Sequence, residues 1–211
     1  MEKNYYIVID TETTGTIEKP FAYDIGWAVI DEQGAVYEAR SYVCEEIFMD
    51  IERMHDAYYG NKRPMYWDDI EDGSRLMRKF STIRMMFFRD CKKWNVCGIV
   101  AHNAPFDYRS TNNTQRLLSE KYRYFFPYGI PIFDSLSMAR KTINKTEEYT
   151  KFCNENGFIC KNGRNRLTAE VLYRYLTQNL GFDESHTALE DVMIEKDIFI
   201  TCLRMMNEVN E

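Results

Sequence analysis

The sequence lacks any run of the roughly 18 uninterrupted apolar residues that a membrane-spanning helix requires. It also lacks a signal-peptide pattern, because a strand-like segment begins within a few residues of Met1. No internal repeat, low-complexity tract or Pro/Gly/Ser-rich linker divides the 211 residues. We therefore expect one domain over residues 1–211, in a soluble protein that works in the cytoplasm and contacts no membrane.

Cysteine pairs of the CxxC type are absent, although the chain has six cysteines. A chain of this length can build a sizeable core without disulfide bonds, so we expect reduced and mostly buried thiols. The alternative is a zinc site formed by Cys91, Cys97, Cys153 and Cys160, whose spacings match no zinc-finger pattern.

Basic residues are in deficit overall, with 27 Lys and Arg against 33 Asp and Glu, a net charge of −6. Contacts to nucleic-acid phosphates are made mostly by Lys and Arg, so this balance by itself argues against nucleic-acid binding. Residues 140–174 are the exception, because eight basic and four acidic side chains give this segment a local charge of +4. The segment is either a solvated surface or a binding surface for an anionic partner.

Hydrophobic patterning predicts strands that alternate with helices. Residues 5–9 are continuously apolar, which is typical of a strand buried on both faces at the centre of a sheet. Further strands are predicted over 22–30, 35–43, 97–101 and 131–135, and helices over 44–59, 74–93, 147–156, 167–179 and 188–208, with helices also following 97–101 and 131–135. Residues 61–67 contain Pro64 and are interpreted as a loop, and 157–164 as a hairpin that turns at Asn162–Gly163. The pattern predicts an α/β fold with a mixed five-stranded sheet covered by helices.

Acidic residues follow two of the buried strands. Asp10 and Glu12 are separated by one residue after the strand at 5–9, so their side chains point the same way. Asp107 lies in the first turn of a helix that begins near Asn103, directly after the strand at 97–101. All three would therefore lie at the carboxyl edge of the sheet. The alternatives are a solvated turn for the pair and a favourable helix N-terminal charge for Asp107.

His186 and Asp191 are placed by a capping box, Thr187–Glu190, at the start of the last helix. Five positions along a helix would turn the two side chains about 140° apart. Because His186 precedes the helix, its loop can bring the imidazole beside Asp191. Otherwise His186 is an ordinary surface residue.

Four carboxylates that converge at one sheet edge would repel each other unless divalent cations lay between them. Oxygen ligands suit Mg²⁺ or Mn²⁺, and two such ions are a common means of hydrolysing a phosphodiester. The sequence thus predicts a site for two Mg²⁺ or Mn²⁺ ions.

Three segments carry a resemblance to a known family. They are VIDTETTG at residues 8–15, AHNAPFD at 101–107 and HTALED at 186–191. Together they resemble, in their order along nearly the whole chain, the three motifs of the DEDDh (DnaQ-like) 3′→5′ exonucleases, typified by the proofreading subunit of bacterial DNA polymerase III. The compact architecture and the basic insertion at about 143–166 are also similar to stand-alone exonucleases of phages and prophages.

The resemblance implies a role for each matching residue. Asp10, Glu12 and Asp191 would hold the catalytic metal, Asp10 would also reach the second metal, and Asp107 would support the second. His186 would be the general base. Contacts to the 3′-terminal nucleotide would come from Thr11, Thr13, Thr14, His102, Asn103 and Phe106, where Asn103 has the alternative of only capping its helix. Backbone contacts farther along the strand are predicted for Lys161, Arg164 and Arg166, whereas Asp134 is interpreted as a helix cap.

The implied fold is ribonuclease-H-like, and the implied function is removal of nucleoside 5′-monophosphates from the 3′ end of single-stranded DNA. RNA is the closest alternative substrate, as in oligoribonuclease, and no residue distinguishes the sugars. A DNA polymerase is a candidate partner, so a catalytically silent polymerase-accessory module is a further alternative, as is a structural protein with surface acids. Residues 54–59 lack the family's apolar-Gly-Ile turn, which leaves the residue that separates the terminal bases unassigned.

Overall fold

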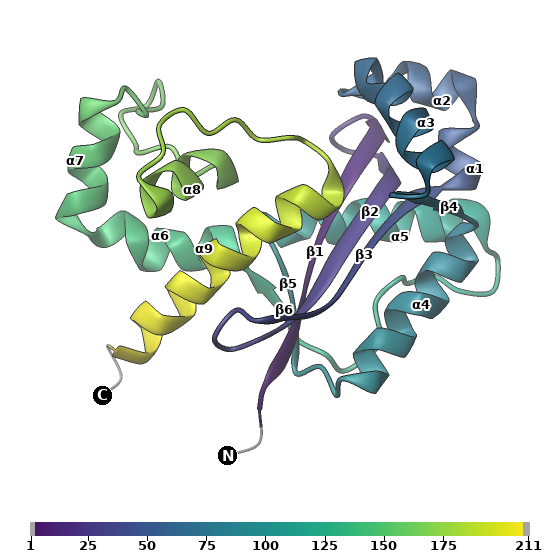
Figure 1. The fold of residues 1–211 in the computed structure, drawn as a ribbon, viewed down its shortest axis with the longest axis horizontal. Helices are drawn as coiled ribbons and strands as arrows, with labels where there is room; N and C mark the ends of the chain where they lie inside the picture. Colours follow the sequence, from purple (N-terminus) through teal and green to yellow (C-terminus); the bar gives the residue numbers. More distant parts are fainter. Residues whose placement is uncertain (1–2, 209–211) are drawn as a thin grey trace.

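A mixed six-stranded sheet forms the centre of the computed structural model, which describes residues 3–208 (Figure 1). The strands are β1 (Tyr5–Gly15), β2 (Pro20–Asp31), β3 (Val36–Cys44), β4 (Leu76–Arg78), β5 (Gly98–Ala101) and β6 (Ile132–Asp134). Their order across the sheet is β4-β3-β2-β1-β5-β6. β1, β2 and β3 are antiparallel neighbours, while β5 runs parallel to β1 and β6 parallel to β5. The carboxyl ends of β1 and β5 therefore meet at the same edge.

Helices cover both faces of this sheet (Figure 1). α4 (Phe80–Lys93) and α5 (Ala104–Leu118) pack on one face, and α9 (Ala188–Glu208) crosses the other. Beyond α9 lie α6 (Ser135–Lys141), the 3₁₀ turn η2 (Ile143–Lys145), α7 (Glu147–Glu155) and α8 (Ala169–Thr177). Near the carboxyl end of β1 lie α1 (Glu45–Phe48), α2 (Ile51–His55), η1 (Gly60–Lys62) and α3 (Arg63–Asp72).

Successive side chains of β1 point to opposite faces of the sheet, so this strand contributes to the core on both faces. Ile7 and Ile9 are fully buried with Trp27 and Phe87 in the cluster that includes residues of α4. Val8 is fully buried with Phe199 in the cluster that includes residues of α9. Since Asp10 and Glu12 keep the phase of Val8, both carboxylates belong to the α9 side of β1.

Two predictions about residues 61–93 were wrong. Residues 61–67 are not a loop: α3 begins at Arg63, and Pro64 lies in its first turn, where proline's missing N–H costs no hydrogen bond. The helix predicted over 74–93 begins only at Phe80, because Leu76–Arg78 form β4 and pair with the end of β3. This pairing adds the sixth strand to a sheet predicted to have five.

The helix predicted over 44–59 is instead two short helices, α1 and α2, because Asp50 takes an extended conformation and its side chain caps α2, which ends at His55. The other predicted elements occur close to their expected positions, with a smaller hairpin than expected in the basic segment. Within 157–168 the ladder consists of a single bridge, between Ile159 and Asn165. Gly163 adopts a φ of 76°, the left-handed conformation that the predicted turn requires.

The six cysteines are free thiols; Cys97 is exposed, Cys160 is intermediate and the other four are buried. None of them belongs to either group of potential metal ligands found among residues 3–208. In the same span, no helix has both the length and the apolar content needed to cross a bilayer.

Candidate active site

Three carboxylates meet at the carboxyl end of β1. Asp10 and Glu12 come from β1 itself, and Asp191 from the first turn of α9. Each offers one oxygen, and these three oxygens lie within 4.8 Å of one another. We call these residues the carboxylate triad.

The positive charge near the triad is too small to balance its three carboxylates, and their pKa values rise as a result. Burial, followed by the charge of Asp191, raises the pKa of Glu12 to about 9. Burial and neighbouring carboxylates likewise raise the pKa of Asp191 to about 8 and that of Asp10 well above its ordinary value. Lys62 is the cation that opposes this effect at Glu12 and Asp191. Oδ1 of Asp191 is moreover buried without a hydrogen-bond partner. These oxygens therefore fit a hard divalent cation such as Mg²⁺ or Mn²⁺.

Asp107 lies next to the triad but outside the group of oxygens that approach within 4.8 Å. Its Oδ1 accepts a hydrogen bond of 2.8 Å from the Thr11 hydroxyl, which also lies 2.9 Å from Ser110 Oγ. Burial raises the pKa of Asp107 to about 7, although the bond from Thr11 opposes the shift. The Thr11 side chain is thus turned toward α5, away from the face that carries the triad.

Glu195 is a further acidic residue of the site that the sequence reasoning missed. It lies one helical turn after Asp191 on α9 and is only 4% exposed. Its Oε2 accepts a hydrogen bond of 3.1 Å from the backbone N–H of His102, and its charge raises the pKa of Asp10 after burial. The spacing of four residues from Asp191 on a predicted helix was the available signal, since such residues share a face.

His186 lies on the loop before α9 in a constrained geometry. Its φ is 51°, a left-handed conformation that is uncommon outside glycine. Nδ1 lies 3.6 Å from Glu184 Oε2, and the imidazole stacks on the ring of Tyr59 with centroids 4.3 Å apart. Burial and Lys62 lower the pKa of His186, which favours the neutral imidazole. Tyr59 and Glu184 carry no motif signal, and reasoning from the sequence did not identify them.

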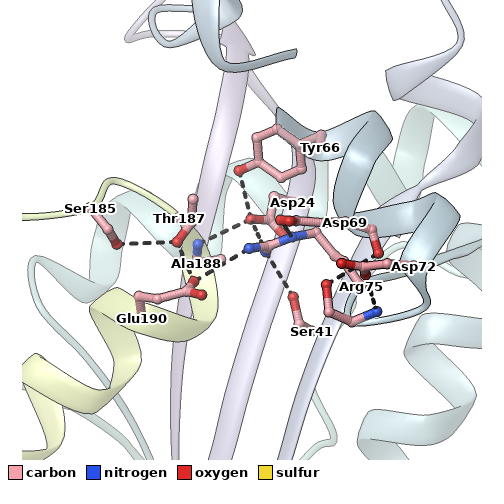
Figure 2. Close-up of polar contacts among 11 residues, drawn as sticks. Asp24, Ser41, Tyr66, Asp69, Asp72, Arg75, Ser185, Thr187, Ala188 and Glu190 are labelled. Atoms are coloured by element: carbon pink, nitrogen blue, oxygen red, sulfur yellow. Dashed lines mark hydrogen bonds and ion pairs between the residues drawn. The ribbon is translucent and has the colours of Figure 1, made fainter. Parts of the chain in front are cut away.

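A buried ionic cluster fixes the start of α9 beside β2 (Figure 2). Asp24 Oδ2 accepts hydrogen bonds from the Tyr66 hydroxyl at 2.7 Å, Arg75 Nη1 at 3.0 Å and the Ala188 N–H at 3.0 Å. Arg75 also contacts Glu190 Oε2 at 3.4 Å, and the Thr187 hydroxyl donates to the same carboxylate. Thr187 thus immediately precedes α9, as predicted, but the cap differs from a capping box: the Thr187 hydroxyl donates to the Glu190 side chain, and Asp24 accepts the first helical N–H.

Close packing of β2 against α9 depends on Gly26. A Cβ atom at this position would lie 2.4 Å from the backbone nitrogen of Leu189, closer than real contacts allow. Because Gly26 has no side chain, α9 can approach the sheet closely enough to bring Asp191 beside Asp10 and Glu12.

The other predicted nucleotide contacts are distributed around the triad. Thr14 is buried and its hydroxyl donates to the Arg53 carbonyl, Thr13 is partly exposed, and Phe106 is partly exposed beside the Arg109 guanidinium. Both ring nitrogens of His102 are already within hydrogen-bond distance of protein oxygens, Nδ1 at 2.9 Å from Ser135 Oγ and Nε2 at 2.9 Å from the Leu167 carbonyl.

Asn103 occupies the residue before α5, yet its side chain caps nothing. Asp134 Oδ1 instead accepts the backbone N–H groups of Asn103 and Ala104 at 3.0 and 3.3 Å. The expectation that Asn103 caps α5 was wrong, and so was the expectation that Asp134 caps its own helix, where it makes no side-chain cap. The exposed Asn103 side chain remains free for a substrate contact.

A groove with a volume of about 1040 Å³ lies beside the triad, and Glu195 and Glu184, which neighbour Asp10 and Asp191, are in its lining. Its lining also includes His102 and Asn103, and Arg164 and Arg166 of the basic segment. Arg140, Asn144 and Asn165 also contribute to its wall, whereas Lys161 is exposed nearby and is not part of the lining.

Known structures share this fold, although neither a protein-family model nor a curated protein sequence matches the chain. Exonuclease I of E. coli in complex with a 5cy-dT13 oligonucleotide aligns with a TM-score of 0.61 and 13% identity, over 99% of this chain and 42% of that one. Exonuclease I from Methylocaldum szegediense aligns with a TM-score of 0.56 and 17% identity, over 97% and 40% of the two chains. The chain therefore has the ribonuclease-H-like exonuclease fold and spans about two fifths of the length of these enzymes.

Proposed function

We propose that the chain is a metal-dependent 3′→5′ exonuclease of the DEDDh type that releases nucleoside 5′-monophosphates from single-stranded DNA. The observation that supports this most strongly is the convergence of Asp10, Glu12 and Asp191 within 4.8 Å beside His186, on a fold shared with exonuclease I. A fold alone does not fix a function, so the proposal depends on this arrangement of side chains.

The triad would hold the catalytic cation, and Asp10 together with Asp107 would hold a second one. Two divalent cations at such a site stabilise the charge that develops on the attacking and leaving oxygens of a phosphodiester. Glu195 adds negative charge next to Asp10 and holds the backbone of His102 in place. Its role would be to position the turn between β5 and α5 rather than to contact the substrate.

His186 would take the proton from the attacking water. Nδ1 faces Glu184, which leaves Nε2 as the atom to accept it. The lowered pKa of His186 supplies the neutral imidazole that a general base must have. Glu184 would then stabilise the imidazolium that forms, because its Oε2 lies 3.6 Å from Nδ1.

The strand would leave the site through the groove that Arg164 and Arg166 line. Guanidinium groups contact phosphate oxygens well, and the exposed Asn103 could reach the terminal nucleotide. DNA is proposed as the substrate because exonuclease I has been solved with an oligo-dT strand on the same fold. Single-stranded RNA is the substrate that the experiment must compare with it.

The experiment is degradation of matched 5′-labelled DNA and RNA oligonucleotides in Mg²⁺ or Mn²⁺, with a His186→Ala control. A ladder that shortens from the 3′ end, requires metal and disappears in the control is the expected result. A faster ladder on RNA would make the chain an exoribonuclease. Tight binding of the strand without hydrolysis in either metal would overturn the proposal in favour of a catalytically silent binding module.

A further inference from the structure

A second group of potential metal ligands shares Asp191 with the carboxylate triad. Glu184, His186 and Asp191 each offer one ligand atom, and these atoms lie within 4.8 Å of one another. Two ligands of a tetrahedral Zn²⁺ ion with bonds near 2.0 Å are about 3.3 Å apart. Glu184 Oε2 and His186 Nδ1 are 3.6 Å apart, so little movement would be needed to bind such an ion.

Further contacts constrain the three ligands of this group. Asp191 is only 5% exposed, and its Oδ1 lacks a hydrogen-bond partner. The imidazole of His186 is held by the stacked ring of Tyr59, and Lys62 binds the carbonyl of Ser185 in the same loop. The loop therefore holds its nitrogen ligand next to a buried oxygen that lacks a partner.

We propose that Glu184, His186 and Asp191 form an inhibitory site for a borderline divalent cation of the Zn²⁺ type. Imidazole nitrogen is a good ligand for Zn²⁺, whereas Mg²⁺ prefers an all-oxygen environment, so the two groups of ligands select different ions. A cation bound through Nδ1 of His186 would displace the proton of that nitrogen, which leaves the neutral imidazole protonated at Nε2 and unable to act as the base, and would draw Asp191 away from the triad. Inhibition rests on the proposed function, whereas binding does not.

Histidine NMR tests the binding directly, because the chain has only three histidines, His55, His102 and His186. With ¹⁵N-labelled histidine and excess MgCl₂, one equivalent of ZnCl₂ is expected to shift the ring signals of His186. His186→Ala assigns these signals. The partly buried ring of His102, whose nitrogens contact Ser135 Oγ and the Leu167 carbonyl, reports that the fold is retained. Unchanged His186 signals at saturating ZnCl₂ would overturn the site.

Two variants separate the proposed ligand from general charge. Glu184→Gln removes a ligand and is expected to weaken Zn²⁺ binding at least about tenfold. Asp183→Asn removes the same charge from an exposed neighbour outside the group, and is expected to change the affinity less than about threefold. Equal weakening by the two variants would show that the loop acts only through its charge, which would also overturn the site.

Activity then tests inhibition separately. In excess Mg²⁺, the zinc concentration for half-inhibition of each protein, relative to its own zinc-free rate, is expected to rise at least about tenfold in Glu184→Gln. Zinc binding without any Mg²⁺-dependent hydrolysis would refute the proposed function and leave the site intact. Hydrolysis that zinc inhibits equally in both variants would refute the inhibitory role of the site.

Discussion

The ring of Tyr59 stacks on the imidazole of His186, with the two planes only 13° apart. This contact joins the segment between α2 and α3 to the loop that precedes α9. Lys62 reinforces the contact by binding the Ser185 carbonyl. His186 has a left-handed backbone with a φ of 51°, a conformation that persists only where surrounding contacts hold it, and these two contacts help to do so.

Replacement of Tyr59 is therefore expected to affect turnover more than substrate binding. Tyr59→Ala removes the stacked ring and should lower kcat by about 10- to 100-fold, since a misplaced general base loses its alignment, with little change in KM. Tyr59→Phe keeps the ring and should retain nearly full activity. Steady-state hydrolysis of a labelled oligonucleotide measures both. Equal losses of kcat in the two variants would show that the hydroxyl, rather than the stacking, is what His186 needs.

Arg75 is expected to be essential for stability. It is 5% exposed and pairs with the fully buried Asp24 at 3.0 Å (Figure 2). Arg75→Met would leave Asp24 without its countercharge and should lower the free energy of unfolding by about 3–5 kcal/mol. The matched control is Arg78→Met, at the exposed last residue of β4, which should change the free energy of unfolding by less than about 0.5 kcal/mol. Urea denaturation measures both, and similar values would contradict the assigned role of Arg75.

The sequence pattern correctly predicted the features that depend only on residues close together in the chain. The apolar run at 5–9 identified the central strand, and alternation placed Asp10 and Glu12 on one face. The polar residues before α9 predicted where this helix begins, and that start places Asp191 in its first turn.

Long-range pairing explains what the sequence did not predict. Leu76 begins a helical apolar spacing, but Leu76–Arg78 pair with the end of β3, a contact that no local rule reports. Asparagine is a favoured residue at the start of a helix, but the Asn103 side chain makes no cap, and Asp134 on the neighbouring strand accepts the Asn103 N–H instead. Glu184 and Tyr59 are brought to His186 only by tertiary structure, so nothing in their own segments marked them.

Metal removal is expected to make stability fall as the pH rises. Burial raises the pKa of Glu12 to about 9 and of Asp191 to about 8 in the folded protein, from ordinary values of 4.5 and 3.8. The folded state therefore binds more protons than the unfolded state over this interval, and the free energy of unfolding decreases from about pH 4 to about pH 9. Thermal denaturation in EDTA at about pH 5 and about pH 9 measures the decrease.

Added Mg²⁺ is expected to reverse this loss, most strongly at about pH 9. At a concentration about 100 times its dissociation constant, a bound ion adds about 2.7 kcal/mol to stability. The double variant Asp10→Asn/Glu12→Gln removes two of the repelling charges, and should show both a weaker pH dependence in EDTA and little gain from Mg²⁺. Metal-free protein that becomes more stable toward pH 9 would contradict the assignment of the triad.

The groove beside α6 and α8 is expected to bind the substrate strand beyond its terminal nucleotide. Arg164→Glu/Arg166→Glu reverses two exposed charges that line it, so KM should rise for a strand of about 15 nucleotides and stay nearly constant for one of about three. The salt dependence of binding to the longer strand should also weaken, by about 0.7 in its logarithmic slope for each phosphate that an arginine no longer neutralises.

A control for net charge is available on the opposite face of the sheet. Lys79→Glu/Lys92→Glu changes the total charge by the same amount at exposed positions in and next to α4, which lies far from α6 and α8 (Figure 1). This variant should leave the ratio of KM for long and short strands within about twofold of the starting protein, because exposed charges more than about 10 Å from the strand are screened. An equal rise in this ratio for both double variants would show that overall charge governs binding. The groove would then have no specific part in holding the strand, whereas a rise confined to Arg164→Glu/Arg166→Glu would establish its role.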